Sequence, residues 1–295
     1  MMFIRDIYAA KGAAGQAVIS FELFPPKTNE GERSLLEKTL PALMQLKPDY
    51  CSVTCGAGGS TRDKTMRIVD CIQRQHGLTA LAHLTCVCAT RQQIGELVEQ
   101  ARALGVKNVL ALRGDPPGGE GEFRKTDGGF EFAYELVTFL RGLGGLSLGV
   151  AGFPEGHIAC REGKYVDWDR LKAKIDCGAD FALSQLFFDN RDFYEFRDYL
   201  GRQGVTVPLC PGIVPILNAG QIKRFTALCG AKMPAPMLAR LDQLGDNDAA
   251  VAEFGIEYAT RQCEDLLRQG VPGIHFYTLN KARSTTAVLR NLGLA

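Results

Sequence analysis

The chain has 295 residues, 46% of them hydrophobic, and its 34 Lys and Arg residues nearly balance its 33 Asp and Glu residues. This balance excludes the basic surface of a nucleic-acid binder and the polybasic segment of a protein held on a membrane. No apolar stretch approaches the ~18 residues of a membrane-spanning helix, and the N-terminus lacks the features of a signal peptide. We therefore expect a globular, cytoplasmic protein that works on small molecules.

Ten cysteines and four histidines are spread along the chain without the spacing of a metal site. No Cys-x-x-Cys pair occurs, and a chain of this length does not depend on disulfides for its stability. Four cysteines lie in apolar runs, which is typical of buried, unreactive thiols; these are Cys51, Cys86, Cys88 and Cys210. We expect reduced structural cysteines and no bound metal.

Short apolar or β-branched runs alternate with longer amphipathic stretches along the whole chain. In chain order, the runs that predict strands are 17–21, 50–54, 79–85, 108–112, 147–151, 181–187, 207–213 and 273–278. The stretches that predict helices between them include 32–46, 91–104, 132–143, 167–177, 192–202 and 253–268. About eight βα units in a chain of this size indicate a (β/α)8 TIM barrel.

Glycines mark the predicted turns from helix to strand. A Gly followed by an apolar residue closes an amphipathic stretch, as in glycine-capped helices, at Gly77, Gly105, Gly178, Gly204 and Gly270. The interval from Gly204 to Gly270 is too long for one βα unit, so we expect extra helices within 233–248, before the final strand.

An open, doubly wound sheet is the alternative architecture. It would normally carry Gly-x-Gly-x-x-Gly after its first strand, and neither this sequence nor the phosphate-binding Gly-x-x-x-x-Gly-Lys-Ser/Thr occurs. We therefore interpret residues 1–295 as a single barrel domain.

In such a barrel the chemistry lies at the C-terminal ends of the strands. Glu22 ends the first predicted strand and is followed by Leu23-Phe24-Pro25-Pro26. Apolar surroundings disfavour the charged form of a carboxylate, which suits a general acid at neutral pH. A buried structural ion pair explains the same pattern equally well.

Other strand ends carry polar or glycine-rich sequence. Arg113-Gly114-Asp115-Pro116-Pro117 is either a rigid turn that approaches a ligand or an ordinary turn. The segment 54–59, Thr-Cys-Gly-Ala-Gly-Gly, either offers N–H groups to a phosphate or is a flexible loop. Gln185, an amide in an apolar strand, is a structural hydrogen-bonding group or recognises an amide-like heterocycle. The turn at 113–117 is followed by three further glycines, Gly118, Gly119 and Gly121.

Six segments, taken together and in this order, resemble the methylenetetrahydrofolate reductase family over nearly the whole chain. They are 20–26 (Ser-Phe-Glu-Leu-Phe-Pro-Pro), 53–57, 112–115, 178–189, 211–213 and 275–280. The resemblance implies a (β/α)8 barrel with FAD at its C-terminal face. It also implies a two-step reaction in which NADH or NADPH reduces FAD and leaves. Methylenetetrahydrofolate then takes the hydride to give methyltetrahydrofolate, a methyl source for methionine synthesis.

The resemblance also assigns roles to single residues. Glu22 matches the general acid that protonates a folate nitrogen, and Asp115 matches the carboxylate beside flavin and pterin. Four positions match residues that contact the substrates: Gln185, Gln221, Phe225 and Lys281. The positions that match the FAD site are Thr54, Ala57, His83, Arg113, Gly114, Asp115, Ala133, Phe153, His157, Asp167, Arg170 and Lys174. Without the resemblance, the simpler explanation of the two histidines is core packing, and that of the charges in 167–174 is a solvated helix face.

Four positions depart from the family pattern. Phe153 stands where the family often has Tyr, and Cys55 where it often has an aromatic residue. Ala173 stands where a basic residue often binds the FAD phosphates, so we expect Lys174 to carry more of that contact. Lys281 stands where Arg often holds the folate tail, and Lys cannot make the bidentate carboxylate contact.

Two alternative functions remain. One is a barrel lyase or methyltransferase that acts on a pterin without flavin, and the other is a non-catalytic folate- or flavin-binding protein. Barrels of the family associate, so the resemblance implies a homo-oligomer. The chain ends soon after the eighth predicted unit, and we therefore expect no regulatory domain and no inhibition by S-adenosylmethionine.

Overall fold

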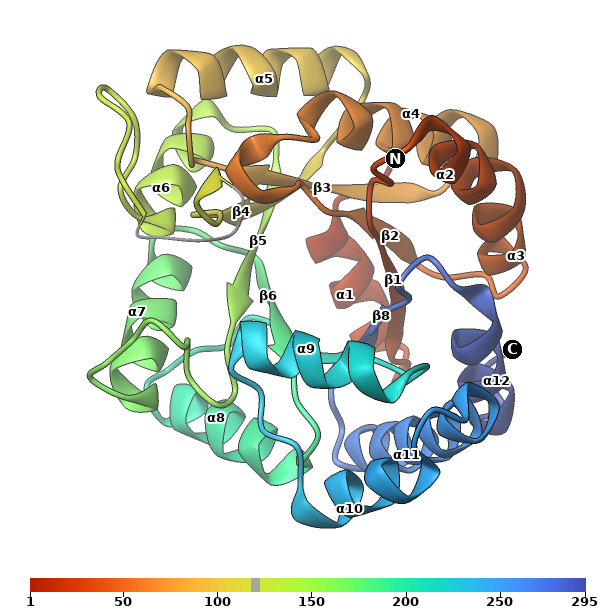
Figure 1. Ribbon diagram of the computed structural model, residues 1–295. Coiled ribbons are helices and arrows are strands. Elements are labelled where there is room, and N and C mark those ends of the chain that lie inside the picture. Colours follow the sequence, from red (N-terminus) through yellow and green to blue (C-terminus); the bar gives the residue numbers. More distant parts are fainter. Residues whose placement is uncertain (118–122) are drawn as a thin grey trace.

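The computed structural model describes residues 1–117 and 123–295. Its parallel strands pair in sequence order, and β8 pairs with β1, so that the sheet closes into a barrel (Figure 1). This confirms the predicted (β/α)8 fold. The strands are β1 (Val18–Leu23), β2 (Tyr50–Val53), β3 (Thr79–Thr85), β4 (Asn108–Leu112), β5 (Ser147–Gly152), β6 (Phe181–Leu186), β7 (Leu209–Ile213) and β8 (Gly273–Tyr277).

Helices surround the barrel, and two more lie over its ends in Figure 1, one behind the barrel opening and one in front of the strands. The two are α1 (Ile4–Ala13) and α9 (Ala219–Cys229). Extra helices were expected within 233–248, and one helix, α10 (Ala235–Leu244), lies there. The remaining α-helices are α2 (Asn29–Ser34), α3 (Leu40–Met44), α4 (Arg62–His76), α5 (Arg91–Ala103), α6 (Ala133–Leu143), α7 (Lys164–Asp176), α8 (Asn190–Arg202), α11 (Asp248–Arg268) and α12 (Ala282–Asn291).

The first helical stretch differs from the single helix expected over 32–46. It begins at Asn29, where the Thr28 side chain accepts a hydrogen bond from the Gly31 N–H, and it contains the π-helical turn η1 (Leu35–Thr39) before α3. Pro41 explains the break, because it has no N–H to donate and its ring crowds the carbonyl four residues earlier. The turn ahead of it widens accordingly, and the Leu40 N–H donates to the Leu35 carbonyl.

The predicted glycine turns are confirmed. All five glycines named above adopt a positive φ, between 62° and 112°, a conformation that other residues rarely take. Each therefore ends its helix and turns the chain into the next strand at the bottom of the barrel. This arrangement leaves the opposite, C-terminal ends of the strands free for the longer loops.

The interior of the barrel is filled at its lower end by apolar and aromatic side chains. Tyr50, Phe181 and Leu110 are among the residues that pack there with Ile4 and Tyr8 of α1. Helix α1 thus closes the N-terminal end of the barrel, and any cavity must open at the other end.

The structure also bears on the expectations for the cysteines, for the glycines after Pro117 and for membrane-spanning helices. Cys51, Cys86 and Cys210 are buried and unpaired, but the expectation for Cys88 is wrong. Cys88 is exposed because it adopts a left-handed turn (φ 54°) after β3 rather than continuing the strand. Gly118, Gly119 and Gly121 lie outside the described residues. No helix in the described part of the chain is both long and apolar enough to cross a membrane.

Candidate active site at the C-terminal end of the barrel

A cavity of about 810 Å³ opens at the C-terminal ends of the strands. Its size is within the range of sites for cofactors and other small molecules. Its walls include the predicted residues Glu22, Thr54, His83, Arg113, Gly114, Asp115, Ala133, Phe153, His157, Asp167, Arg170, Lys174 and Gln185. The loop and strand ends singled out in the sequence therefore meet in one place.

Four predicted residues do not line this cavity. Ala57 begins the short turn η2 (Ala57–Gly59), and the next N–H, of Gly58, donates to the Asp115 carbonyl at 3.1 Å. Gln221 and Phe225 lie on α9, whose last residues, Leu228 and Cys229, do reach the cavity. Lys281 is exposed at the start of α12.

Glu22 lies at the cavity floor, with only 5% of its surface exposed. Its Oε2 is 3.3 Å from Nε2 of His275 and 3.4 Å from Nε2 of His83. Burial lowers the pKa of His83 to about 4, although Glu22 opposes this shift and His275 adds to it. His83 is therefore neutral at physiological pH and does not form a true ion pair with Glu22.

Two serines orient the imidazole rings beside Glu22. The Ser52 hydroxyl is 2.6 Å from Nε2 of His83, and the Ser20 hydroxyl is 2.8 Å from Nδ1 of His275. Parallel pairing causes this meeting, because Ser20 and Glu22 of β1 lie level with His275 and Tyr277 of β8. A carboxyl group placed among imidazole and hydroxyl groups can exchange a proton with a ligand.

His275 is the residue of this cluster to which the sequence assigned no role. The available signal was the two-residue period of strands, which places His275 and Tyr277 on the inner face of β8. The Tyr277 hydroxyl donates to the Ser184 carbonyl at 2.7 Å, and this bond fixes the ring at the cavity wall.

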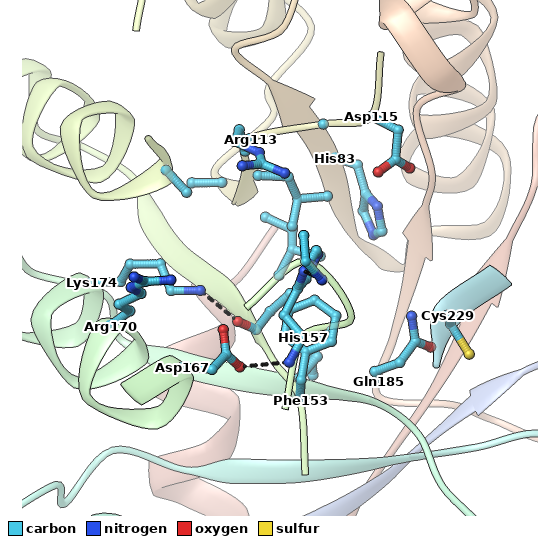
Figure 2. Close-up of a pocket in the computed structure, with 18 of the residues that line it drawn as sticks. His83, Arg113, Asp115, Phe153, His157, Asp167, Arg170, Lys174, Gln185 and Cys229 are labelled. Atoms are coloured by element: carbon cyan, nitrogen blue, oxygen red, sulfur yellow. Dashed lines mark hydrogen bonds between the residues drawn. The ribbon is translucent and has the colours of Figure 1, made fainter. Parts of the chain in front are cut away.

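Lys174 and Arg170 lie on the other side of the cavity from His83 and Asp115 (Figure 2). The Lys174 ammonium donates to the Ala151 carbonyl at 2.8 Å, and burial lowers its pKa to about 8. Arg113 also lowers this pKa, while Asp167 opposes both effects. Within the described residues, neither Lys174 nor Arg113 has a carboxylate at salt-bridge distance, whereas Arg170 pairs with Glu162 at 2.6 Å.

The loop between β5 and α7 forms the wall near these cations. The Asp167 carboxylate accepts a hydrogen bond from the His157 N–H at 3.1 Å (Figure 2), and the rings of His157 and Phe153 meet edge to face with centroids 4.6 Å apart. The indole of Trp168 donates to the Phe153 carbonyl at 2.8 Å. Burial raises the pKa of Asp167 and lowers that of His157, because desolvation disfavours the charged form of each group.

The turn after β4 brings Asp115 to the cavity. Gly114 precedes it with φ 84°, and a Cβ at this position would lie 2.7 Å from a methyl group of Val87. Only glycine fits this turn without displacing β3 and the loop after it. The turn therefore presents the Arg113 and Asp115 side chains, of opposite charge, at the same rim.

An aromatic and apolar rim surrounds the opening. Phe132 and Tyr134 stack with centroids 5.7 Å apart and are each 44% exposed. Ile158 and Leu228 are 60% and 69% exposed at the same rim. Exposed apolar side chains around a cavity commonly contact a ligand.

A closed barrel of this kind, with a buried carboxyl–imidazole cluster and cationic side chains in a cavity at its C-terminal end, has the architecture of the (β/α)8 enzymes. The methylenetetrahydrofolate reductase family model matches residues 7–293. The chain therefore belongs to the methylenetetrahydrofolate reductase family, as the sequence segments suggested.

Relatives from plants and bacteria support this assignment. The chain is 40% identical over 290 residues to methylenetetrahydrofolate reductase (NADH) 1 of Arabidopsis thaliana, covering 95% of this chain and 49% of that protein. It is 36% identical over 280 residues to 5,10-methylenetetrahydrofolate reductase of Escherichia coli strain K12, covering 95% and 92%. The chain thus spans about half the length of the plant relatives and most of the bacterial one.

The fold also resembles that of a solved structure. An uncharacterized protein from Clostridium thermocellum, described as binding two copies of 5-methyl-5,6,7,8-tetrahydrofolic acid, superposes with a TM-score of 0.66. The two chains are 15% identical, and the match covers 98% of this chain and 96% of the other. At this identity the likeness concerns the fold alone.

Proposed function

We propose that this protein reduces 5,10-methylenetetrahydrofolate to 5-methyltetrahydrofolate with NADH or NADPH as the electron source and FAD as the cofactor, in the cytoplasm. The observation that carries the proposal is that one cavity holds a buried carboxyl group and two cations, Lys174 and Arg113, without a carboxylate at salt-bridge distance among the described residues. A proton donor and an anion site are the two features that this chemistry requires of the protein.

The cavity fits FAD in two respects. Lys174 and Arg113 have no carboxylate at salt-bridge distance within the described residues, and they would bind the pyrophosphate. Leu110, Leu112 and Leu183 give the cavity an apolar lining that suits a flat ring system. When bound there, FAD would accept a hydride from the nicotinamide and pass it to the folate.

Glu22 would act on the folate. Its carboxyl group would give a proton to the nitrogen that leaves the methylene bridge, so that the five-membered ring opens to an iminium cation. The negative charge of Asp115 at the same cavity would stabilise this cation. The Gln185 side chain would hydrogen-bond the pterin or the nicotinamide in turn.

Helix α9 would supply the remaining contacts. Gln221 and Phe225 are proposed to contact the folate, with Phe225 stacking on the bound ring, and Lys281 to attract the carboxylates of the folate tail. Ala57 is proposed to lie beside the flavin through the turn that Asp115 anchors. A homo-oligomeric state is proposed on the same family grounds.

Two measurements test the proposal against its alternatives. An absorption spectrum of the purified protein, followed by FAD titration, should show flavin bands or flavin uptake. A pterin lyase without flavin would show neither. Formation of 5-methyltetrahydrofolate from NADH or NADPH and methylenetetrahydrofolate should then exceed the protein concentration, which a non-catalytic binding protein cannot achieve.

A further inference from the structure

The pairing of β6 with β7 is irregular beside the cavity. After the last regular pair, β6 contributes two residues, Ser184 and Gln185, whereas β7 contributes only Pro211. The next aligned pair is Leu186 with Gly212. This arrangement is a β-bulge, which is rare in parallel pairs and redirects the side chains of the bulged strand. The bulge lies at the cavity, where Gln185 is one of the lining residues (Figure 2).

The hydrogen bonds at the bulge have changed partners. The Ala182 N–H donates to the Pro208 carbonyl at 2.9 Å, and a regular parallel ladder would continue with the Gly212 N–H donating to the Ser184 carbonyl. The Gly212 N–H instead has the Ser184 hydroxyl as an acceptor, at 2.9 Å. The Ser184 carbonyl accepts a hydrogen bond from the Tyr277 hydroxyl at 2.7 Å. A side chain of β8 thus binds a carbonyl group of β6.

Tyr277 reaches β6 because β7 has a glycine where the ring crosses it. In the barrel β7 lies between β6 and β8. A Cβ at Gly212 would lie 2.6 Å from Cε2 of the Tyr277 ring and 3.0 Å from its hydroxyl oxygen. A side chain at position 212 would therefore push the hydroxyl away from the Ser184 carbonyl. Tyr277 and Gly212 depend on each other at this crossing.

The same bulge fixes the side chain of Gln185. Its Oε1 accepts a hydrogen bond from the N–H of the next residue, Leu186, at 2.8 Å. Its own carbonyl accepts from the Ser184 hydroxyl at 2.9 Å. With Oε1 engaged, the amide presents its NH2 group to a ligand as a donor. The nicotinamide and the pterin each have a carbonyl oxygen, so one donor suits both.

We propose that Tyr277 is a positioning residue for Gln185: its hydroxyl, bonded to the Ser184 carbonyl, holds the bulge that directs the Gln185 amide into the cavity. Tyr277 also lines the cavity, so a direct contact with the substrate is the alternative that the tests must separate. This inference deepens the proposed function and rests on it for the role of Gln185.

The first test follows the bulge itself and needs no substrate. In ¹⁵N NMR spectra of the protein, Gln185→Ala assigns the side-chain amide signal of Gln185. In Tyr277→Phe we expect this signal to move and the Leu186 N–H to exchange with solvent about tenfold faster, because Oε1 no longer accepts from it. An unchanged signal and exchange rate would overturn the inference. A freely exchanging Leu186 N–H in the wild type would also overturn it, even if the variant failed to fold.

The second test asks whether Tyr277 acts through Gln185. Reoxidation of reduced flavin by methylenetetrahydrofolate is compared in the wild type, Tyr277→Phe, Gln185→Ala and the double variant. Loss of one hydrogen bond to the substrate should lower the second-order rate constant by about tenfold in each single variant. The double variant should be no slower than Gln185→Ala. If the two effects multiply, Tyr277 acts independently of Gln185 and the inference is wrong.

A matched control separates this effect from the general loss of a tyrosine hydroxyl. Tyr258→Phe removes a hydroxyl that donates to the Phe188 carbonyl at 2.6 Å, beyond the end of β6. We expect this variant to keep the wild-type exchange of Leu186 and the wild-type reoxidation rate. Equal losses in Tyr258→Phe and Tyr277→Phe would contradict a specific role of Tyr277. Absence of folate turnover in the wild type would refute the proposed reaction, and the NMR comparison would still decide whether Tyr277 holds Gln185.

Discussion

At the residue scale, the site depends on what burial does to charged groups. Glu22 is buried, and Lys174 has no carboxylate at salt-bridge distance within the described residues. His83 is neutral beside Glu22, and a carbonyl oxygen is the hydrogen-bond partner of Lys174. Such arrangements cost stability and are found chiefly where a ligand supplies the missing interaction.

Lys174 makes FAD binding depend on pH. Its pKa is about 8 in the free protein, and a pyrophosphate beside it would raise that pKa because an anion favours the charged form. Lys174 therefore holds its proton more tightly in the complex with FAD than in the free protein. FAD affinity should be constant below pH 8 and should weaken above it, by up to about tenfold per pH unit.

The dissociation constant, measured by flavin fluorescence between pH 7 and 9.5, tests this prediction. Lys174→Gln has no charge to lose, so it should bind FAD more weakly and without this pH dependence. A wild-type affinity that stays constant over the whole range would contradict the role of Lys174.

At the scale of elements, two segments that line the cavity are held together. The Glu155 carboxylate, in the loop after β5, accepts hydrogen bonds from the Lys232 N–H at 3.0 and 3.1 Å, just beyond α9. In the same region a Cβ at Gly230 would lie 3.1 Å from Ile158 of that loop. These contacts fix the end of α9 against the wall that carries Phe153 and His157.

Removing the Glu155 carboxylate should loosen α9. A hydrogen bond to a charged group contributes about 1.5–3 kcal/mol, so Glu155→Ala should speed amide exchange in α9 by roughly 10- to 100-fold. Hydrogen exchange followed by mass spectrometry measures this directly. Glu162→Ala removes an exposed carboxylate of the same loop and should leave α9 unchanged. Equal exchange of α9 in Glu155→Ala and the wild type would mean that other contacts hold the helix.

Much of this element plan could be predicted from the sequence because its signals are local. A glycine that must adopt a positive φ indicates a turn, and a two-residue alternation of apolar and polar side chains indicates a strand. The signal for the helix break before Pro41 is also local, because proline has no N–H to donate. The single helix expected over 32–46 did not take this into account. The grouping of Glu22 with His275 was not predictable from local pattern, because it depends on the register of β1 against β8, 253 residues apart.

At the scale of the whole molecule, the barrel is open at one end and closed at the other. The N-terminal helix α1 closes it, with Ile4 fully buried and its N–H donating to the Asn108 side chain at 2.8 Å. No sequence pattern indicated a role for this segment, since its partners Tyr50, Leu110 and Phe181 come from three different strands. Only the closed barrel brings them together.

This closure should matter for stability more than for chemistry. Ile4→Ala leaves a cavity in a packed interior, and we expect the free energy of unfolding to fall by about 2–5 kcal/mol. Leu294 is 43% exposed, and Leu294→Ala should change it by less than about 0.5 kcal/mol. Urea denaturation measures both variants. A loss below about 1 kcal/mol for Ile4→Ala would show that α1 does not contribute to the core.

The central claim is that Glu22 donates the proton that lets the folate accept a hydride. Stopped-flow absorbance of the flavin tests it, with NADH and methylenetetrahydrofolate added in turn to the wild type and to Glu22→Gln. Reduction by NADH should proceed at similar rates in both proteins. Reoxidation by methylenetetrahydrofolate should be at least about 100-fold slower in Glu22→Gln, the usual contribution of a general acid. Equal reoxidation rates in the two proteins would contradict the account.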